Sequence, residues 1–320
     1  MNIDEKFIGK FEDFKNYKHT RLAHTSNLQI PHTFLNRIAY FEAKEQYLIT
    51  DREDKTIKIL SKTGNYLGEY NPNLIFEYPF AIYVNNLKNE IFVGDYKLQC
   101  IFVFDENFNK ITEFGHDVAK APNTITMDKI TGLVYCTDYW YDKVSIWYGE
   151  QPSSDYDDNC KTTGNFHCTK YTLSNEFTCD SPAYIQIADS KIFIVSAVEL
   201  EIEENTSKLK DIKKGANCIF VFDKIKLCIL FKIKLKDWIE PYGLVVDSQS
   251  NIYTSASNLD NDNNISTTAY LFKFDKNGCL LNKMQFSNWL PIDFYIHENR
   301  ELSISTDTFP LQLDVLKDGD

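Results

Sequence analysis

Residues 79–115 read PFAIYVNNLKNEIFVGDYKLQCIFVFDENFNKITEFG and contain four short apolar runs separated by turn residues. The runs Phe80–Val84, Glu90–Gly94, Cys100–Phe104 and Lys110–Phe114 are rich in Ile, Val, Phe and Tyr, and Asn, Asp or Gly follows each of them. Branched and aromatic residues favour strands, whereas Asn, Asp and Gly favour the turns between strands. The stretch therefore predicts a meander of four antiparallel strands, which needs copies of itself to bury both faces.

The rest of the chain supplies such copies. Asp51, Asp95 and Asp138 follow the second strand of three successive units, and Ala197, Ala256 and Thr306 take the corresponding places in the later units. A proline opens every unit. The six predicted units span residues 31–70, 79–115, 122–173, 182–235, 241–286 and 291–316.

Six four-stranded units with a period of about 45 residues predict an all-β fold, a six-bladed β-propeller formed as one domain by residues 1–320. The last unit lacks a fourth strand. Within the N-terminal segment 1–28, the run Lys6–Phe11 is strand-like, so we expect it to pair onto the last blade and close the ring. The competing structure is a pair of β-sandwiches, which does not require six matching prolines.

The best-preserved unit also carries a family pattern. Ile91–Asp95, Ile101–Asp105 and Phe114-Gly115, together with the unit opening Pro241–Asp247, resemble the NHL repeat. A Gly-His…Trp-Asp pairing is absent, which disfavours WD40 repeats. The resemblance implies a platform that binds proteins, or RNA through a basic face. Related six-bladed folds include calcium-dependent lactonases, so the fold alone does not give the function.

Charge and hydropathy exclude some classes of partner. The 320 residues carry a net charge of −12, which disfavours nucleic acids and anionic membranes because both bind mainly through Lys and Arg. The N-terminus has no apolar signal-peptide core, and apolar runs such as Cys218–Phe222 are too short to span a bilayer. The eight cysteines are scattered, as is typical of reduced thiols. We therefore expect a monomeric cytoplasmic protein.

One face of the predicted propeller combines acidic and aromatic residues. Loops between second and third strands share this face with the loops that link blades. Tyr and Trp are common anchors of protein interfaces, so we predict a protein or peptide partner, with a basic one suiting the acidic groups. The alternative is that the aspartates fix turns and the aromatic rings pack between blades. The predicted partner-binding residues are Asp95, Tyr96, Asp138, Tyr139, Trp140, Tyr141, Trp238 and Trp289.

Metal-dependent chemistry is the alternative function. Glu77, Asp180 and Glu240 each lie just before a blade-opening proline, and three converging carboxylates could hold Ca²⁺ in the central channel of a hydrolase or lactonase. The loop Asp260–Asn264 lacks the glycine and the glutamate that a calcium loop needs. The set Cys160, His167 and Cys168 is incomplete for zinc. Since no nucleophile or phosphate-loop motif is present, we predict a non-enzymatic binding protein without a cofactor.

Overall fold

The structure is a computed structural model in which almost all regular structure is β-strand. The one exception among the described residues is a 3-10 turn, η1 (Glu42–Lys44). In this part of the chain no helix has the length and apolar character that a membrane crossing requires. The described residues are 17–24, 35–71, 75–150, 168–202, 209–235, 238–259, 265–287, 291–297, 302–306 and 312–318.

The chain divides into two compact units. The N-terminal unit comprises His32–Lys62 and Tyr66–Thr178, and the C-terminal unit comprises Cys179–Asp320 with Met1–Pro31 and Thr63–Asn65. Apart from one two-stranded hairpin, the described strands of both units form four-stranded antiparallel sheets, and in five of these the strand order follows the chain. The protein therefore has the blades of a β-propeller, as the repeat pattern predicts.

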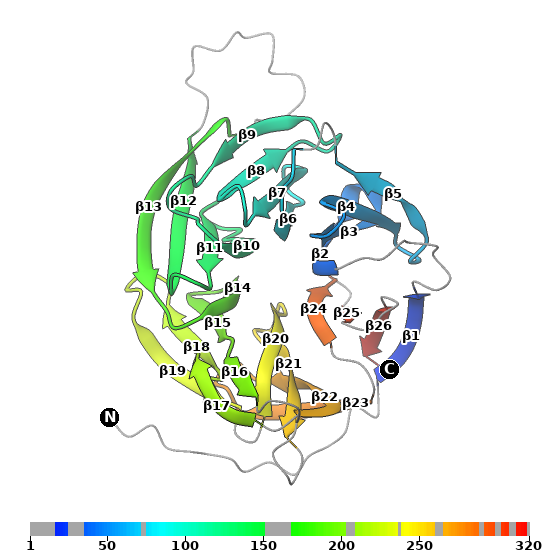
Figure 1. Cartoon of the computed structure of the whole chain (residues 1–320), viewed down its shortest axis with the longest axis vertical. Helices are drawn as coiled ribbons and strands as arrows, with labels where there is room; N and C mark the ends of the chain where they lie inside the picture. The colour runs from blue at the N-terminus through cyan, green and yellow to red at the C-terminus, as the bar shows by residue number, and fades with distance from the viewer. Residues whose placement is uncertain are drawn as a thin grey trace. The chain divides into compact units, whose positions relative to one another are not determined.

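Three blades form the N-terminal unit (Figure 1). Blade one consists of β2 (Leu35–Phe41), β3 (Gln46–Asp51), β4 (Thr56–Ser61) and β5 (Tyr66–Tyr70). Blade two consists of β6 (Pro79–Asn85), β7 (Glu90–Asp95), β8 (Cys100–Phe104) and β9 (Lys110–Phe114). Blade three consists of β10 (Pro122–Met127), β11 (Val134–Asp138), β12 (Lys143–Glu150) and β13 (Lys170–Thr178).

The C-terminal unit holds two more blades of consecutive strands. Blade four contains β14 (Pro182–Ala188), β15 (Lys191–Ser196), β18 (Cys218–Asp223) and β19 (Ile229–Lys234). The charged insertion of this blade forms a separate hairpin of β16 (Glu199–Ile202) and β17 (Leu209–Lys214). Blade five contains β20 (Trp238–Val246), β21 (Ile252–Leu259), β22 (Ile265–Phe274) and β23 (Leu280–Ser287).

Five four-stranded blades are thus each formed by one continuous stretch, where the repeats predict six. A further four-stranded sheet draws on both ends of the chain, with β24 (Pro291–Ile296), β25 (Leu302–Thr306), β26 (Gln312–Asp318) and β1 (Tyr17–His24). Strand β1 pairs antiparallel with β26, from Tyr17 opposite Asp318 to His24 opposite Gln312. The N-terminal partner strand is therefore β1, and the predicted strand Lys6–Phe11 lies outside the described residues.

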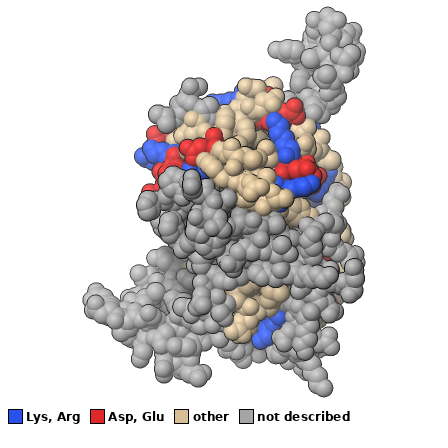
Figure 2. Space-filling model, turned by 90° about the vertical axis from the view of Figure 1, so that its right-hand side faces the viewer, with Lys and Arg blue, Asp and Glu red and all other residues tan. Residues whose placement is uncertain are grey.

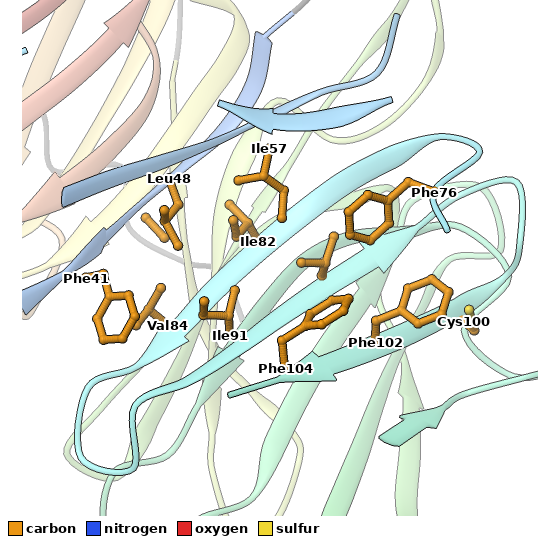
Figure 3. Close-up of a cluster of buried hydrophobic side chains, with 12 residues drawn as sticks. Phe41, Leu48, Ile57, Phe76, Ile82, Val84, Ile91, Cys100, Phe102 and Phe104 are labelled. Carbon is orange, nitrogen blue, oxygen red and sulfur yellow. The ribbon is translucent and has the colours of Figure 1, made fainter. Parts of the chain in front are cut away.

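The sequence of blade two predicts its strands closely because buried inner strands need unbroken apolar runs. All residues of β7 and β8 are buried, whereas β9 is mostly exposed or half-buried. Strands β8 and β9 have the predicted bounds, and β6 and β7 are longer than predicted only by residues at their ends. The apolar face of blade two packs against blade one around Leu48, Ile57 and Phe104 (Figure 3).

The first strands of neighbouring blades lie side by side, which is the arrangement of a propeller. In the N-terminal unit β6 contacts both β2 and β10, and in the C-terminal unit β20 contacts both β14 and β24. Buried Arg37 on β2 ties the three N-terminal blades together. Its guanidinium lies 5.1 Å from the centre of the Phe80 ring on β6, and its Nε donates to the carbonyl of Asn123 on β10 at 3.1 Å.

Candidate functional site

The repeated aspartates are buried acceptors for backbone amides. Asp95 is 0% exposed at the end of β7. One carboxylate oxygen accepts the amides of Lys97 and Leu98, at 3.0 and 2.9 Å, in the loop that follows. The other accepts the amides of Glu77 and Tyr78, at 2.8 and 2.9 Å, in the segment that enters the blade. The carboxylate therefore fastens the loop after β7 to the segment before β6.

Asp138 repeats this arrangement in blade three. It is buried, and its two oxygens accept the amides of Ala121 at 3.0 Å and Tyr141 at 3.2 Å. Burial raises its pKa, although the backbone hydrogen bonds oppose the shift. In blade one, a single oxygen of Asp51 accepts the amides of Glu53 and Asp54 in the loop that follows. The sequence analysis predicts that these aspartates bind a partner and gives turn fixing as the alternative. Their contacts in all three blades are those of residues that fix turns.

The register corrects one repeat position. The blade-opening prolines in the described part of the chain lie opposite the end of the second strand, as Pro79 lies opposite Asp95 and Pro122 opposite Asp138. In blade four Pro182 lies opposite Ser196, so Ser196 and not Ala197 is the equivalent of Asp95. The Ser196 hydroxyl accepts the amide of Ala216 at 2.9 Å.

The predicted aromatic residues of blades two and three lie at the surface. The exposed fractions are 38% for Tyr96, 52% for Trp140 and 49% for Tyr141. The Tyr96 ring lies 5.5 Å from the ring of Tyr78, and Trp140 contacts Tyr139 edge to face at 5.0 Å. Burial is the largest cause that raises the pKa of the Tyr96 phenol. We call these five residues the aromatic surface.

Charged residues of both signs surround the aromatic surface. Lys120 lies 4.9 Å from the centre of the Tyr141 ring, and Arg52 lies 5.7 Å from that of Tyr78. Because Asp95 and Asp138 are buried, neither contributes an accessible negative charge. Figure 2 shows Lys and Arg next to Asp and Glu over the described part of one side of the molecule. At the aromatic surface itself, Glu77 directly precedes Tyr78 in the chain and pairs with Lys55 and Lys97, so groups of both signs lie there.

The remaining predicted site residues are not brought together by the described structure. Trp238 begins β20, but its side chain is not among those described, and Trp289 lies outside the described residues. The Glu77 carboxylate is held by Lys55 at 3.0 Å and Lys97 at 3.3 Å, and these hydrogen bonds lower its pKa.

The other two proposed channel ligands belong to the C-terminal unit. Asp180 is exposed and accepts the hydroxyl of Ser181 at 3.2 Å, and the side chain of Glu240 is not described. Of the weaker metal candidates, the loop Asp260–Asn264, Cys160 and His167 lie outside the described residues, and Cys168 is buried.

A different group of metal-ligating residues was missed by the sequence reasoning. Ligand atoms of Cys100, Glu113 and His116, all in or next to blade two, lie within 4.8 Å of one another. Their separation along the chain hides this proximity. The signal was available in the predicted meander, because the short turn between β8 and β9 fixes which residues of the two strands face each other.

Comparison with known proteins shows the fold and no family. No protein-family model and no curated protein matches the sequence. The structure is similar to streptogramin B lyase, with a TM-score of 0.55 and 12% identity over 96% of this chain and 99% of that one. It is also similar to the WD40 propeller domain of Doa1, with a TM-score of 0.55 and 11% identity over 88% and 78% of the two chains. It is also similar to a hydrazine synthase of Kuenenia stuttgartiensis, with a TM-score of 0.56 and 9% identity over 87% of this chain and 77% of that one.

Proposed function

We propose that this protein is a β-propeller of the NHL type that binds a protein or peptide segment on its aromatic surface. The single observation that carries the proposal is the exposure of Tyr96, Trp140 and Tyr141 on loops of two adjacent blades. Large aromatic side chains supply much of the binding energy of protein interfaces, because they bury area at a low cost in side-chain entropy. The scaffold beneath them is rigid, since Asp95 and Asp138 fix both loops.

The proposal includes a closed ring of six blades. The four-stranded sheet formed by β24, β25, β26 and β1 would serve as the sixth blade, with β1 taking the role first assigned to Lys6–Phe11. Pairing of the two ends of the chain removes sheet edges that would otherwise be open. Support comes from the four-stranded composition of this sheet, which matches the blades.

The chemistry of the surface defines the partner that we propose. Exposed aromatic rings, in contact as the pairs Tyr78–Tyr96 and Tyr139–Trp140, favour a segment with aromatic or aliphatic side chains. Lys55 and Lys97 share Glu77, so one carboxylate against two ammonium groups leaves one positive charge there. Binding that is carried by the aromatic rings should depend weakly on ionic strength, in contrast to the strong salt dependence of a charged interface.

A displayed library of random peptides tests this proposal. Peptides selected on the wild-type protein should bind the double variant Tyr96→Ala with Trp140→Ala roughly tenfold or more weakly, because each anchor of this kind contributes about 2 kcal/mol. The matched control is Leu87→Ala with Ile130→Ala. These residues are 74% and 83% exposed in the turns between first and second strands of the same two blades.

Quenching of Trp140 fluorescence on titration with a selected peptide gives an independent measure of contact. Equal binding to the wild type and to the aromatic double variant, or no selected peptide at all, would refute the proposal. Reduced binding by the control variant would place the interface at the opposite ends of the blades.

A further inference from the structure

The group formed by Cys100, Glu113 and His116 lies at one end of blade two. Cys100 is the first residue of β8 and is buried, Glu113 is on β9, and His116 follows this strand by two residues. Alternate residues of a strand point to the same face, so Cys100 shares a face with Phe102. Phe102 lies opposite Glu113 in the register. The pairing of the two strands therefore brings a thiol, a carboxylate and an imidazole to one place.

We propose that Cys100, Glu113 and His116 bind a zinc ion, with a water molecule as the fourth ligand. Zinc takes sulfur, nitrogen and oxygen ligands at about 2.0–2.3 Å, which sets tetrahedral ligand atoms about 3.3–3.6 Å apart. The three ligand atoms here lie within 4.8 Å of one another. The side chains of Glu113 and His116 are 37% and 55% exposed, so they are free to close the remaining distance by rotation.

The two oxygens of the Glu113 carboxylate have different partners, so one can bind a metal ion while the other is held by a hydrogen bond. One oxygen faces Nε2 of His116 at 3.4 Å, on the side of the proposed ion. The other accepts a hydrogen bond from Nζ of Lys110 at 2.7 Å. The ammonium group also lies 5.2 Å from the centre of the Phe102 ring. Outer hydrogen bonds of this kind commonly orient carboxylate ligands, so Lys110 would position Glu113 while the first oxygen binds zinc.

Burial, followed by the charges of Glu113 and Asp95, raises the pKa of the Cys100 thiol to about 12, and Lys110 opposes the shift. A divalent cation deprotonates a thiol that coordinates it, so binding at this site releases a proton to solvent. The half-exposed positions of Glu113 and His116 leave a route for the ion and the water molecule.

Blade four provides a comparison within the same chain. Cys218 begins its third strand and lies opposite Ser196, as Cys100 lies opposite Asp95. It is equally buried, at 1% exposed, and burial likewise raises its pKa to about 12. However, Phe220 faces Lys232 where Phe102 faces Glu113, so a cation stands in place of the carboxylate. Cys218 is therefore a matched buried thiol that, among the described residues, belongs to no group of three such ligands.

Titration of the full chain with Co²⁺, followed by competition with Zn²⁺, tests the site. The wild type should bind one cobalt ion per chain, with a thiolate-to-cobalt charge-transfer band that zinc displaces. Cys100→Ser should abolish the band, whereas Cys218→Ser should retain it. His116→Ala and Glu113→Gln alter exposed side chains and leave the core intact, and each should weaken binding at least about tenfold.

Two results would overturn the proposal. The first is the absence of a charge-transfer band in the folded wild-type protein. The second is a band that survives His116→Ala and Glu113→Gln at unchanged affinity, which would show that the cobalt thiolate forms elsewhere. If Cys100→Ser fails to fold, the other two substitutions still decide the outcome, because neither removes a buried group.

Discussion

Replacement of Asp95 by asparagine changes one buried oxygen into an NH₂ group and keeps the size of the side chain. Each carboxylate oxygen accepts two backbone amides, so the new NH₂ group faces two donors whichever way the amide is oriented. A hydrogen bond to a charged group contributes about 1.5–3 kcal/mol, and an unpaired buried donor is costly. Loss of two such bonds predicts a destabilisation of roughly 3–5 kcal/mol, a large fraction of the typical stability of a protein.

Asp105→Asn is the matched control for this experiment. One oxygen of Asp105 accepts the amides of Asn107 and Asn109 in an exposed turn, and an asparagine oxygen can keep both bonds. The other oxygen accepts the exposed side-chain amide of Asn109 at 2.8 Å. The expected cost is therefore about 0.5–1 kcal/mol.

Urea unfolding followed by circular dichroism measures both substitutions, and an unchanged slope identifies a change in stability alone. The reasoning fails if Asp95→Asn costs no more than Asp105→Asn.

The remaining predictions concern the packing of the same unit. Lys58→Met removes a buried ammonium group that bonds Asp54 at 2.7 Å and Glu69, and it should destabilise the protein by about 3–5 kcal/mol at neutral pH. Burial alone lowers the pKa of Lys58, but these carboxylates and Asp51 raise it overall. Wild-type stability should consequently fall as the pH rises above about 10.4, and urea unfolding of Lys58→Met should lack this alkaline loss. Gly94→Ala places a Cβ 2.8 Å from Pro122 of the next blade, so thermal unfolding should show a loss of about 1–3 kcal/mol; an unchanged midpoint would mean that the blades separate easily there.

The sequence predicts the inner strands of the blades well because burial on both faces demands apolar residues throughout. Strands such as β8, with its run CIFVF, therefore stand out against the turn residues around them. Strand β1 reads YKHTRLAH and is mostly polar, so no apolar run marks it. The strand-like run Lys6–Phe11 was therefore predicted to pair with the last blade instead. Pairing of β1 with β26 depends on backbone hydrogen bonds, which composition does not report.

The candidate site could be predicted only in part, because the sequence does not tell whether an acidic side chain is buried or faces solvent. Net charge counts Asp95 and Asp138 as fully as any surface group, although both are buried against backbone amides. Tyr96, Trp140 and Tyr141 next to them are exposed, and their role in binding a partner stays a prediction. The proximity of Cys100, Glu113 and His116 depends on strand register, so it is visible only once β8 and β9 are paired.

For the repeated aspartates, the role of fixing turns is connected with the proposed binding of a partner. Asp95 accepts the amides of Lys97 and Leu98, which directly follow the exposed Tyr96, and Asp138 accepts the amide of the exposed Tyr141. A carboxylate that fixes a loop also fixes the aromatic side chain that the loop presents, and a pre-ordered side chain loses less entropy on binding. The aspartates therefore position the proposed interface without touching the partner. For the same reason, Asp95→Asn should weaken peptide binding even at temperatures where the variant remains folded.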